Sequence, residues 1–262
     1  MIHSTALVAK NVKIAENCAI GPYCIIEENV VVGQGVKLDA HVILKKGTVL
    51  EDNVRVHAGA VIGDDPQILN QNFDFTSGVW VGESTIIREG VTIHRASQKD
   101  QFTKIGRRCL LMAFAHVGHD TCVGDDCILA NQVLLAGCVN IQNHVFLSGG
   151  SMVHQFVHVG ESAFIAGNAV ITVHVPPFIT VVDRNCRANL NVVGLQRRGF
   201  SSKEVADIKA MYRCIYDDGS WAFKRKAEVL LAEKKAQTDK GKQFLNFFVE
   251  EKPSRGFVYE AH

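Results

Sequence analysis

An aliphatic residue recurs at every sixth position through the N-terminal part of the chain. The series has no exception and comprises Val8, Ile14, Ile20, Ile26, Val32, Leu38, Leu44, Leu50, Val56 and Ile62. The residue two positions before each is small or β-branched, as at Cys18, Val30 and Val54. A helix repeats about every 3.6 residues and a free strand about every two, so neither produces this period. The spacing predicts short strands joined by turns, three to a coil, which stack as a parallel β-helix.

The repeat breaks in two places. A second series of the same period begins at Val81, and the distance from Ile62 to Val81 is not a multiple of six. This shift of phase predicts that a loop near residues 64–78 leaves the β-helix. Lys99 stands at an aliphatic position and predicts a second, shorter loop near 96–103. Loops that leave a regular solenoid usually cover or build a binding face, with tolerated surface insertions as the alternative.

A helical pattern replaces the repeat in the C-terminal part. The repeat fades after Pro176 and Pro177, and Ser201 with Glu204 forms a capping box. One helical face then follows, with Gly219 as its end, and comprises Val205, Ile208, Met211, Tyr212 and Ile215. Two further helices are predicted at about 220–236 and 240–250.

These patterns predict an all-β solenoid over residues 1–190 and a small α-helical domain over 191–262. The repeat resembles that of the hexapeptide-repeat left-handed β-helix, a known exception to the right-handed crossover rule. Proteins of that kind are usually trimeric acyl- or acetyltransferases, so the resemblance implies a homotrimer.

The composition narrows the classes of function. The 262 residues are 47% hydrophobic and 21% charged, with 28 Lys and Arg against 27 Asp and Glu. This near neutrality argues against nucleic acid as a partner. No apolar run has the length of a membrane span or a signal peptide, so a soluble, cytoplasmic protein is expected. The eight cysteines are expected to be free thiols, and no CxxC pair suggests zinc.

Two histidines lie three residues apart in the segment 115–120, which reads AHVGHD. Val117 belongs to the inward series, so His116 and His119 flank it on the outside of the β-helix. Rungs eighteen residues apart stack, which predicts that His119, Gly137 and Gln155 form one column. His119 followed by Asp120 could be a general base with its orienting acid, provided that a corner brings the two side chains together.

A zinc site and solvated histidines remain alternatives for this motif. A γ-class carbonic anhydrase shares the expected fold and binds zinc through three histidines, two of them typically five residues apart. His116 and His119 have a different spacing, so no bound metal is expected.

Longer segments resemble the UDP-N-acetylglucosamine O-acyltransferases that begin lipid A synthesis. The resemblance covers essentially the whole chain and includes IREGVTIHR (87–95), LLMAFAHVGHDTCVGDDCILAN (110–131), LAGCV (135–139), MVHQF (152–156), VPPF (175–178) and GLQRRGFS (194–201). It implies that His119 removes the proton from the sugar 3-hydroxyl, that Asp120 orients His119, and that the Gly137 amide stabilises the oxyanion. The acyl donor would be a thioester of acyl carrier protein, and no cofactor is expected.

The resemblance also implies a set of substrate contacts. The nucleotide sugar would be held by His116, His154, Gln155, Asn191, Arg197 and Arg198, and we add His94 because it lies in a nearby rung. Gly167 matches the position that limits acyl length, and a glycine there implies room for a long chain. Acyl carrier proteins are acidic, which favours docking on Arg197-Arg198 or on Lys224-Arg225-Lys226.

Four positions depart from the family pattern. They are Ile68, Asn70, Cys138 and Val193, where an acid, a base, a histidine and a glutamate are usual. The acceptor therefore stays open between UDP-N-acetylglucosamine, another nucleotide sugar and a 3-amino analogue. A non-catalytic or metal-binding β-helix is the alternative from another class.

Overall fold

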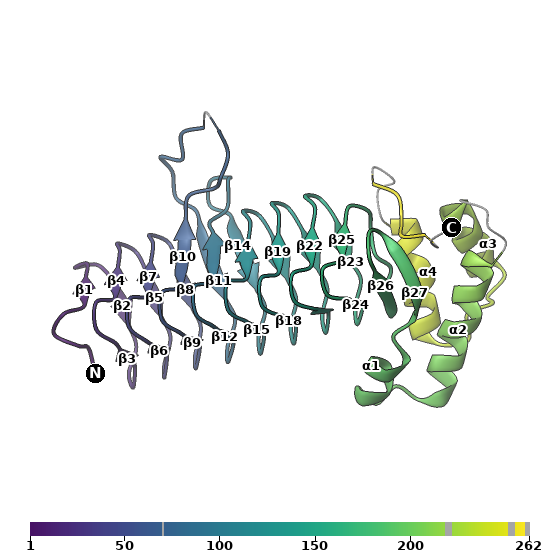
Figure 1. Cartoon of the computed structure of the whole chain (residues 1–262), viewed down its shortest axis with the longest axis horizontal. Coiled ribbons are helices and arrows are strands. Elements are labelled where there is room, and N and C mark those ends of the chain that lie inside the picture. Colours follow the sequence, from purple (N-terminus) through teal and green to yellow (C-terminus); the bar gives the residue numbers. More distant parts are fainter. Residues whose placement is uncertain (70, 218–221, 251–254, 260–262) are drawn as a thin grey trace.

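The computed structural model describes residues 1–69, 71–217, 222–250 and 255–259. Asn70 and Gly219, both named above, lie outside these residues. The described chain forms a long three-sided β-helix with helices packed at its C-terminal end (Figure 1). Among the described helices, none is long and apolar enough to cross a membrane.

The three sides of the β-helix are three sheets. Sheet 1 contains nine parallel strands. They are β1 (Leu7–Val8), β4 (Ile25–Ile26), β7 (Ile43–Leu44), β10 (Val61–Asp64), β13 (Thr92–His94), β16 (His116–Val117), β19 (Leu134–Leu135), β22 (Met152–Val153) and β25 (Val170–Ile171).

Sheet 2 contains eight parallel strands. They are β2 (Lys13–Ile14), β5 (Val31–Val32), β8 (Val49–Leu50), β11 (Gly78–Val81), β14 (Phe102–Ile105), β17 (Cys122–Val123), β20 (Asn140–Ile141) and β23 (His158–Val159).

Sheet 3 contains ten strands. They are β3 (Ala19–Ile20), β6 (Lys37–Leu38), β9 (Arg55–Val56), β12 (Ile86–Ile87), β15 (Leu110–Leu111), β18 (Ile128–Leu129), β21 (Phe146–Leu147), β24 (Phe164–Ile165), β26 (Ile179–Val182) and β27 (Cys186–Leu190). The sequence did not predict the antiparallel pairing of β26 with β27, because these strands follow the end of the repeat.

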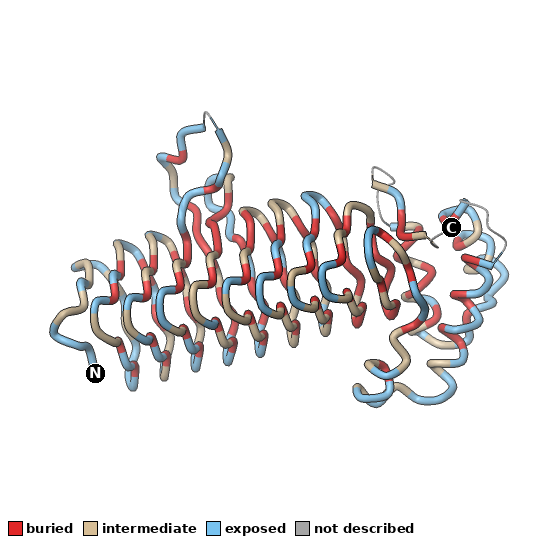
Figure 2. The backbone as a smooth tube through the Cα atoms, in the orientation of Figure 1, coloured by how far each residue is buried: buried red, intermediate tan, exposed pale blue. Residues whose placement is uncertain are grey.

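The core of the β-helix is a stack of inward side chains. In the regular two-residue strands from β3 onward the second residue is buried and therefore points inward, whereas the first is exposed or half-buried and points outward. Figure 2 shows the resulting alternation of buried and more exposed segments along the coils. Residues two positions before the inward ones, such as Cys18, Cys24, Cys109 and Cys127, are buried as well. The predicted inward series is therefore confirmed.

One coil takes eighteen residues, and its corners depend on left-handed backbone. Leu7 pairs with Ile25 and His116 pairs with Leu134, so equivalent positions stack coil upon coil. Many corners carry a non-glycine residue with φ near +58°, such as Asn17 or Asp120. Asn and Asp tolerate this conformation better than other side chains, which accounts for their frequency at these corners.

Two connections leave the β-helix. The first runs between β10 and β11 and projects from the side that carries sheet 1 (Figure 1). The second joins β13 to β14 and is shorter than the predicted 96–103, because Phe102 and Thr103 pair with Gly78 and Val79 in sheet 2.

In the part of the chain that the structure describes, four helices follow the strands, and they begin next to the predicted division after residue 190. They are α1 (Val192–Arg197), α2 (Ser202–Tyr216), α3 (Phe223–Ala232) and α4 (Asp239–Glu250). The capping box of Ser201 and Glu204 is present at the start of α2. The sequence missed α1, and α3 is shorter than the predicted 220–236. The helices pack through an aromatic cluster of Tyr212, Tyr216, Phe223, Phe244, Phe248 and Phe257.

Adjacent residues of β6 provide a test of this stacking. Leu38 is 3% exposed inside the β-helix, whereas its neighbour Lys37 points outward. Leu38→Ala should lower the free energy of unfolding by about 2–5 kcal/mol, because it leaves a cavity between rungs. Lys37→Ala should change it by no more than about 0.5 kcal/mol. Chemical denaturation measures both, and equal effects would contradict the assigned inward and outward faces.

Candidate active site

His119 and Asp120 occupy a corner between sheet 1 and sheet 2. The corner follows β16 and precedes β17, and Asp120 has a φ of +58°. This left-handed residue turns the Asp120 carboxylate back, so that its Oδ2 lies 2.6 Å from Nδ1 of His119. A carboxylate accepts hydrogen bonds, so in the neutral imidazole Nδ1 carries the proton and Nε2 keeps its lone pair. This arrangement suits a general base.

The imidazole of His119 lies against Gly137 of the next coil. A Cβ built on Gly137 would meet Nε2 of His119 at 2.5 Å and Cε1 at 2.6 Å. Any larger residue would therefore displace the ring. The carbonyl oxygen of His119 accepts a 2.8 Å hydrogen bond from the Cys138 amide, which fixes the spacing of the two corners. The Gly137 amide has no acceptor within the described chain.

Asp120 also accepts hydrogen bonds from Ser97 in the connection between β13 and β14. The Ser97 amide donates to Oδ1 at 3.0 Å, and its hydroxyl donates to Oδ2 at 2.6 Å. The Asp120 amide donates to the Thr103 hydroxyl at 2.8 Å. Burial opposes ionisation of Asp120, but the hydrogen bonds from His119 and Ser97 outweigh it and lower the pKa of the carboxyl below its usual value.

His116 has a different environment from His119. It points outward from β16 and its Nδ1 lies 2.8 Å from the Thr92 hydroxyl. Burial, with a smaller effect of His94, lowers the pKa of His116 to about 4. A neutral imidazole can exchange hydrogen bonds with a ligand, but it offers no charge to a phosphate.

His94 lies in the coil before His116, and the two rings are neighbours. It is 9% exposed, its ring meets that of His116 edge to face at 5.2 Å, and its Nδ1 hydrogen-bonds the Asp65 carbonyl oxygen. This burial argues against the direct substrate contact that we predicted for His94. The neighbouring Arg95 is 2% exposed and anchors the long loop through Asp65, Phe73, Phe75 and Ser77.

Cys138 joins His119 and Asp120 in a group that could hold a cation. One potential ligand atom from each lies within 4.8 Å of the others, and no second such group occurs in the part of the chain that the structure describes. Burial, and to a smaller extent Asp120, raises the pKa of the Cys138 thiol. The carboxylate of Asp120 already accepts three hydrogen bonds from His119 and Ser97, so a cation would compete with these donors.

Gln155 continues the column of His119 and Gly137, and His154 precedes it at the same corner. Both are exposed at the corner after β22, and the amide of Phe156 donates to the Gly137 carbonyl oxygen at 3.4 Å. Gly167 lies at a different corner, between sheet 3 and sheet 1. A Cβ there would meet only the Gly149 oxygen, at an ordinary contact distance of 3.4 Å.

The predicted arginines line a cavity of about 660 Å³ on sheet 3. Arg197 is exposed, whereas Arg198 is half-buried and its Nε is buried without a hydrogen-bond partner. Burial lowers the pKa of Arg198, with a smaller opposing effect of Glu161. The stacked rings of Phe146 and Phe164, with centroids 5.4 Å apart, form an apolar wall of the cavity.

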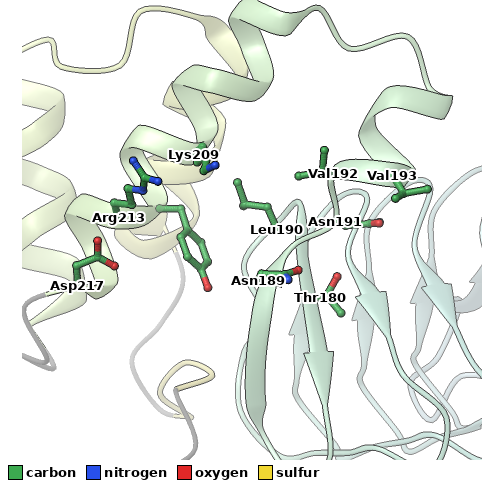
Figure 3. Close-up of a pocket in the computed structure, with 10 residues that line it drawn as sticks. Thr180, Asn189, Leu190, Asn191, Val192, Val193, Lys209, Arg213 and Asp217 are labelled. Carbon is green, nitrogen blue, oxygen red and sulfur yellow. The ribbon is translucent and has the colours of Figure 1, made fainter.

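Asn191 caps the start of α1 beside this cavity. Its Oδ1 accepts from the Gly194 amide at 3.1 Å, and its Nδ2 donates to the Ser162 carbonyl oxygen at 3.0 Å. Both ends of this amide thus already have protein partners. Asn191 and Val193 also line a neighbouring cavity of about 520 Å³, whose other wall carries Lys209 and Arg213 of α2 (Figure 3).

Apart from Gly167, the predicted site residues form two groups within one chain. His94, His116, His119, Asp120, Gly137, His154 and Gln155 follow sheet 1 and its corner with sheet 2. Asn191, Arg197 and Arg198 belong to α1 and its two caps and line a cavity with residues of sheet 3. Figure 1 shows α1 on the side of the molecule away from the long loop. Ser97, Phe146 and Phe164 were missed. The apolar outward positions of sheet 3 could have indicated the two phenylalanines, but Ser97 lies where the repeat is broken and carries no signal.

Three family models match the chain. The model for UDP N-acetylglucosamine O-acyltransferase, domain 2, matches residues 174–258. The model for six repeats of the bacterial transferase hexapeptide matches residues 102–137, and that for the GMPPB C-terminal domain matches residues 2–97.

A solved structure is similar along the whole chain. It is the UDP-N-acetylglucosamine acyltransferase of Francisella novicida, which is 35% identical with a TM-score of 0.93 and is covered over 95% of its length, against 100% of this chain. This likeness confirms the predicted hexapeptide-repeat left-handed β-helix followed by helices.

Two curated relatives have names that also mention acyl carrier protein. An acyl-(acyl-carrier-protein)–UDP-N-acetylglucosamine O-acyltransferase of Pseudomonas fluorescens is 40% identical over 60% of this chain, and the match spans 61% of that relative's length. The corresponding protein of Pseudomonas putida is 41% identical over 83% of this chain and 85% of its own length. The chain belongs to the family of acyl-(acyl-carrier-protein)–UDP-N-acetylglucosamine O-acyltransferases.

Proposed function

We propose that the protein transfers a (3-hydroxy)acyl chain from acyl carrier protein to the 3-hydroxyl of UDP-N-acetylglucosamine, the first step of lipid A biosynthesis. One observation carries the proposal. The imidazole of His119, hydrogen-bonded through Nδ1 to Asp120, lies against Gly137, whose amide has no acceptor within the described chain. The name of the Pseudomonas putida relative joins acyl carrier protein, UDP-N-acetylglucosamine and O-acyl transfer, and that of the Francisella novicida structure joins the same sugar nucleotide and acyl transfer.

The proposed chemistry uses one base and one amide donor. Nε2 of His119 takes the proton of the sugar hydroxyl, whose oxygen attacks the thioester carbonyl carbon. The Gly137 amide stabilises the negative oxygen of the tetrahedral intermediate. The C–S bond then breaks, and the proton on Nε2 passes to the departing thiolate of acyl carrier protein. These steps need no metal and no cofactor.

The acyl chain has an apolar path across sheet 1. From the corner of His119, the outward positions of the next strands carry Leu134 and Met152, which are 42% and 41% exposed. The path ends at the opposite corner, where Gly149 and Gly167 carry no side chain. Apolar side chains favour a hydrocarbon over a polar substituent, so this path suits a long acyl chain.

The nucleotide is proposed to bind at the arginine cavity. Arg197 is exposed and Arg198 is half-buried at this cavity, and guanidinium groups bind phosphate oxygens through charge-assisted hydrogen bonds. This cavity lies on sheet 3, whereas His119 lies at the corner of sheets 1 and 2. One nucleotide sugar can engage both groups if the site forms between two subunits. We therefore propose a homotrimer, whose closed symmetry makes three such sites.

An apolar outward row on sheet 3 supports this assembly. Five successive strands present an apolar residue at the outward position, namely Ile86, Leu110, Ile128, Phe146 and Phe164. Contiguous apolar rows of this kind on a solvent-facing sheet mark protein interfaces.

The proposed substrates are cytoplasmic metabolites, so we place the protein in the cytoplasm.

A second candidate is the same transfer to a 3-amino nucleotide sugar. Cys138 lies beside His119 where the family usually has histidine, and Val193 is 59% exposed at the arginine cavity where glutamate is usual. Both changes remove polar groups near the proposed acceptor. The two candidates differ in whether the product carries an ester or an amide.

The first test combines product analysis with loss of the base. Purified protein with acyl carrier protein thioester should acylate UDP-N-acetylglucosamine, and mass analysis with the 3-amino sugar in parallel separates ester from amide. His119→Ala should lower turnover by about 10²–10⁴, the usual contribution of a general base. His119→Gln keeps the size of the side chain and serves as the control for packing. Near-normal activity in a folded variant would refute the role of His119.

The second test concerns assembly. Light scattering should give three times the chain mass of 28.8 kDa, and the mass should fall for Leu110→Lys. A charge at Leu110 would be desolvated in an interface, which is costly without a partner. Val229→Lys provides the matched control, since Val229 is 46% exposed on α3, away from the apolar row. A fully active monomer at the assay concentration would contradict the shared site.

The third test concerns the donor. Lys224 and Arg225 are exposed on α3, whereas Lys226 donates to the Ile215 carbonyl oxygen. Lys224→Glu with Arg225→Glu should raise the KM for acyl carrier protein and leave the KM for the sugar unchanged. Added salt should weaken the wild type more than the double variant, because it screens the attraction to an acidic partner. Equal effects on both KM values would place the docking surface elsewhere.

A further inference from the structure

The short connection between β13 and β14 reaches back to the candidate base. Ser97 and Asp120 are 23 residues apart in sequence, yet Ser97 donates to both oxygens of the Asp120 carboxylate, at 3.0 Å and 2.6 Å. Ser97 belongs to the segment that interrupts the repeat, and a regular coil has no residue at this place. The interruption thus supplies the carboxylate with two donors.

Ser97 is held in place by buried neighbours. Ala96 is fully buried, and its carbonyl oxygen accepts from the Ser77 hydroxyl at 2.8 Å. That hydroxyl also accepts from Nη1 of Arg95 at 2.8 Å, and Arg95 is itself 2% exposed. These contacts tie residues 95–97 to the base of the long loop. The Ser97 donors are therefore fixed before a substrate arrives, as positioning requires.

The two donors of Ser97 set the plane of the carboxylate. Oδ2 of Asp120 accepts from both the Ser97 hydroxyl and Nδ1 of His119, while Oδ1 accepts from the Ser97 amide. A carboxylate with one donor rotates freely about its Cβ–Cγ bond, whereas three donors hold it in one orientation. That orientation keeps the proton of His119 on Nδ1 and leaves Nε2 facing Gly137.

We propose that Ser97 is a positioning residue for acyl transfer, which acts through Asp120 to keep His119 in the tautomer and orientation of a general base. Ser97 reaches the reacting atoms only through Asp120 and His119. The inference rests on the proposed function, since it assigns Ser97 a part in the same reaction.

Steady-state kinetics of three variants test the effect on the reaction. Ser97→Ala should lower kcat by about 10- to 100-fold, a part of what the whole base contributes, and change either KM by less than about twofold. Ser97→Thr keeps the hydroxyl and should restore kcat to within about threefold of the wild type. Ser151→Ala is the matched control, because Ser151 is buried in a rung and its hydroxyl has no hydrogen-bond partner.

A spectroscopic measurement separates positioning from general structural damage. In ¹⁵N-histidine NMR of the substrate-free protein, the signal lost in His119→Ala identifies His119. The wild type should show a protonated Nδ1 and an unprotonated Nε2, and Ser97→Ala should show a mixture of tautomers. Should Ser97→Ala fail to fold, Ser97→Cys replaces it, since its thiol is a weak donor of similar size.

The outcomes distinguish the two proposals. An unchanged kcat together with an unchanged tautomer in the folded variant would overturn the role of Ser97 and leave acyl transfer intact. A parallel rise of both KM values without a change of kcat would also overturn it. A wild type that transfers no acyl chain would refute the proposed function, and the tautomer measurement would still decide whether Ser97 orients His119.

Discussion

The stacking of one coil on the next is the interaction on which the rest of this structure depends. A two-residue strand cannot bury its aliphatic side chain or pair its backbone groups alone, and both are satisfied only by the coils above and below. The inward columns around Leu38 and Leu129 are buried almost completely for this reason. Packing therefore fixes the inward residues and leaves the outward and corner positions free to carry chemistry.

Corners are suited to a catalytic pair because they reverse the usual divergence of adjacent side chains. In an extended strand His119 and Asp120 would point to opposite faces. The left-handed backbone at Asp120 brings the two side chains to 2.6 Å, and the same corner one coil later places Gly137 beneath the imidazole. A repeat that is needed for stability thus also aligns a base with a backbone donor from a different coil.

The repeat also explains how far the sequence could predict this site. Because the period is fixed, the inward series and the column of His119, Gly137 and Gln155 follow from residue numbers alone, and the register bears this column out. Ser97 could not be found in that way, because it lies in an insertion whose path depends on the buried side chain of Arg95. The burial of His94 has the same cause, since the loop anchored by Asp65 covers it.

The sequence could not predict the separation of the arginines from His119 either. Arg197 and Arg198 follow the last strand, after the repeat has ended, so no register relates them to a coil. Their place on sheet 3 is set by the β26–β27 hairpin and by the Asn191 cap of α1. A motif shared with a family indicates which residues act together, but the side of the solenoid on which each one lies depends on the three-dimensional path of the chain.

His116 and His119 lie three residues apart in one motif, yet they suit different chemical roles. His119 meets a carboxylate that fixes its proton on Nδ1, so its free Nε2 can accept a proton from a substrate. Nδ1 of His116 hydrogen-bonds the Thr92 hydroxyl rather than a carboxylate. Burial, with a smaller effect of the neighbouring His94, lowers the pKa of His116 to about 4. Different environments can give two groups of one kind separate tasks within a site. Here the difference comes from the corner: Asp120 can turn toward His119, whereas His116 still lies in the strand and faces Thr92.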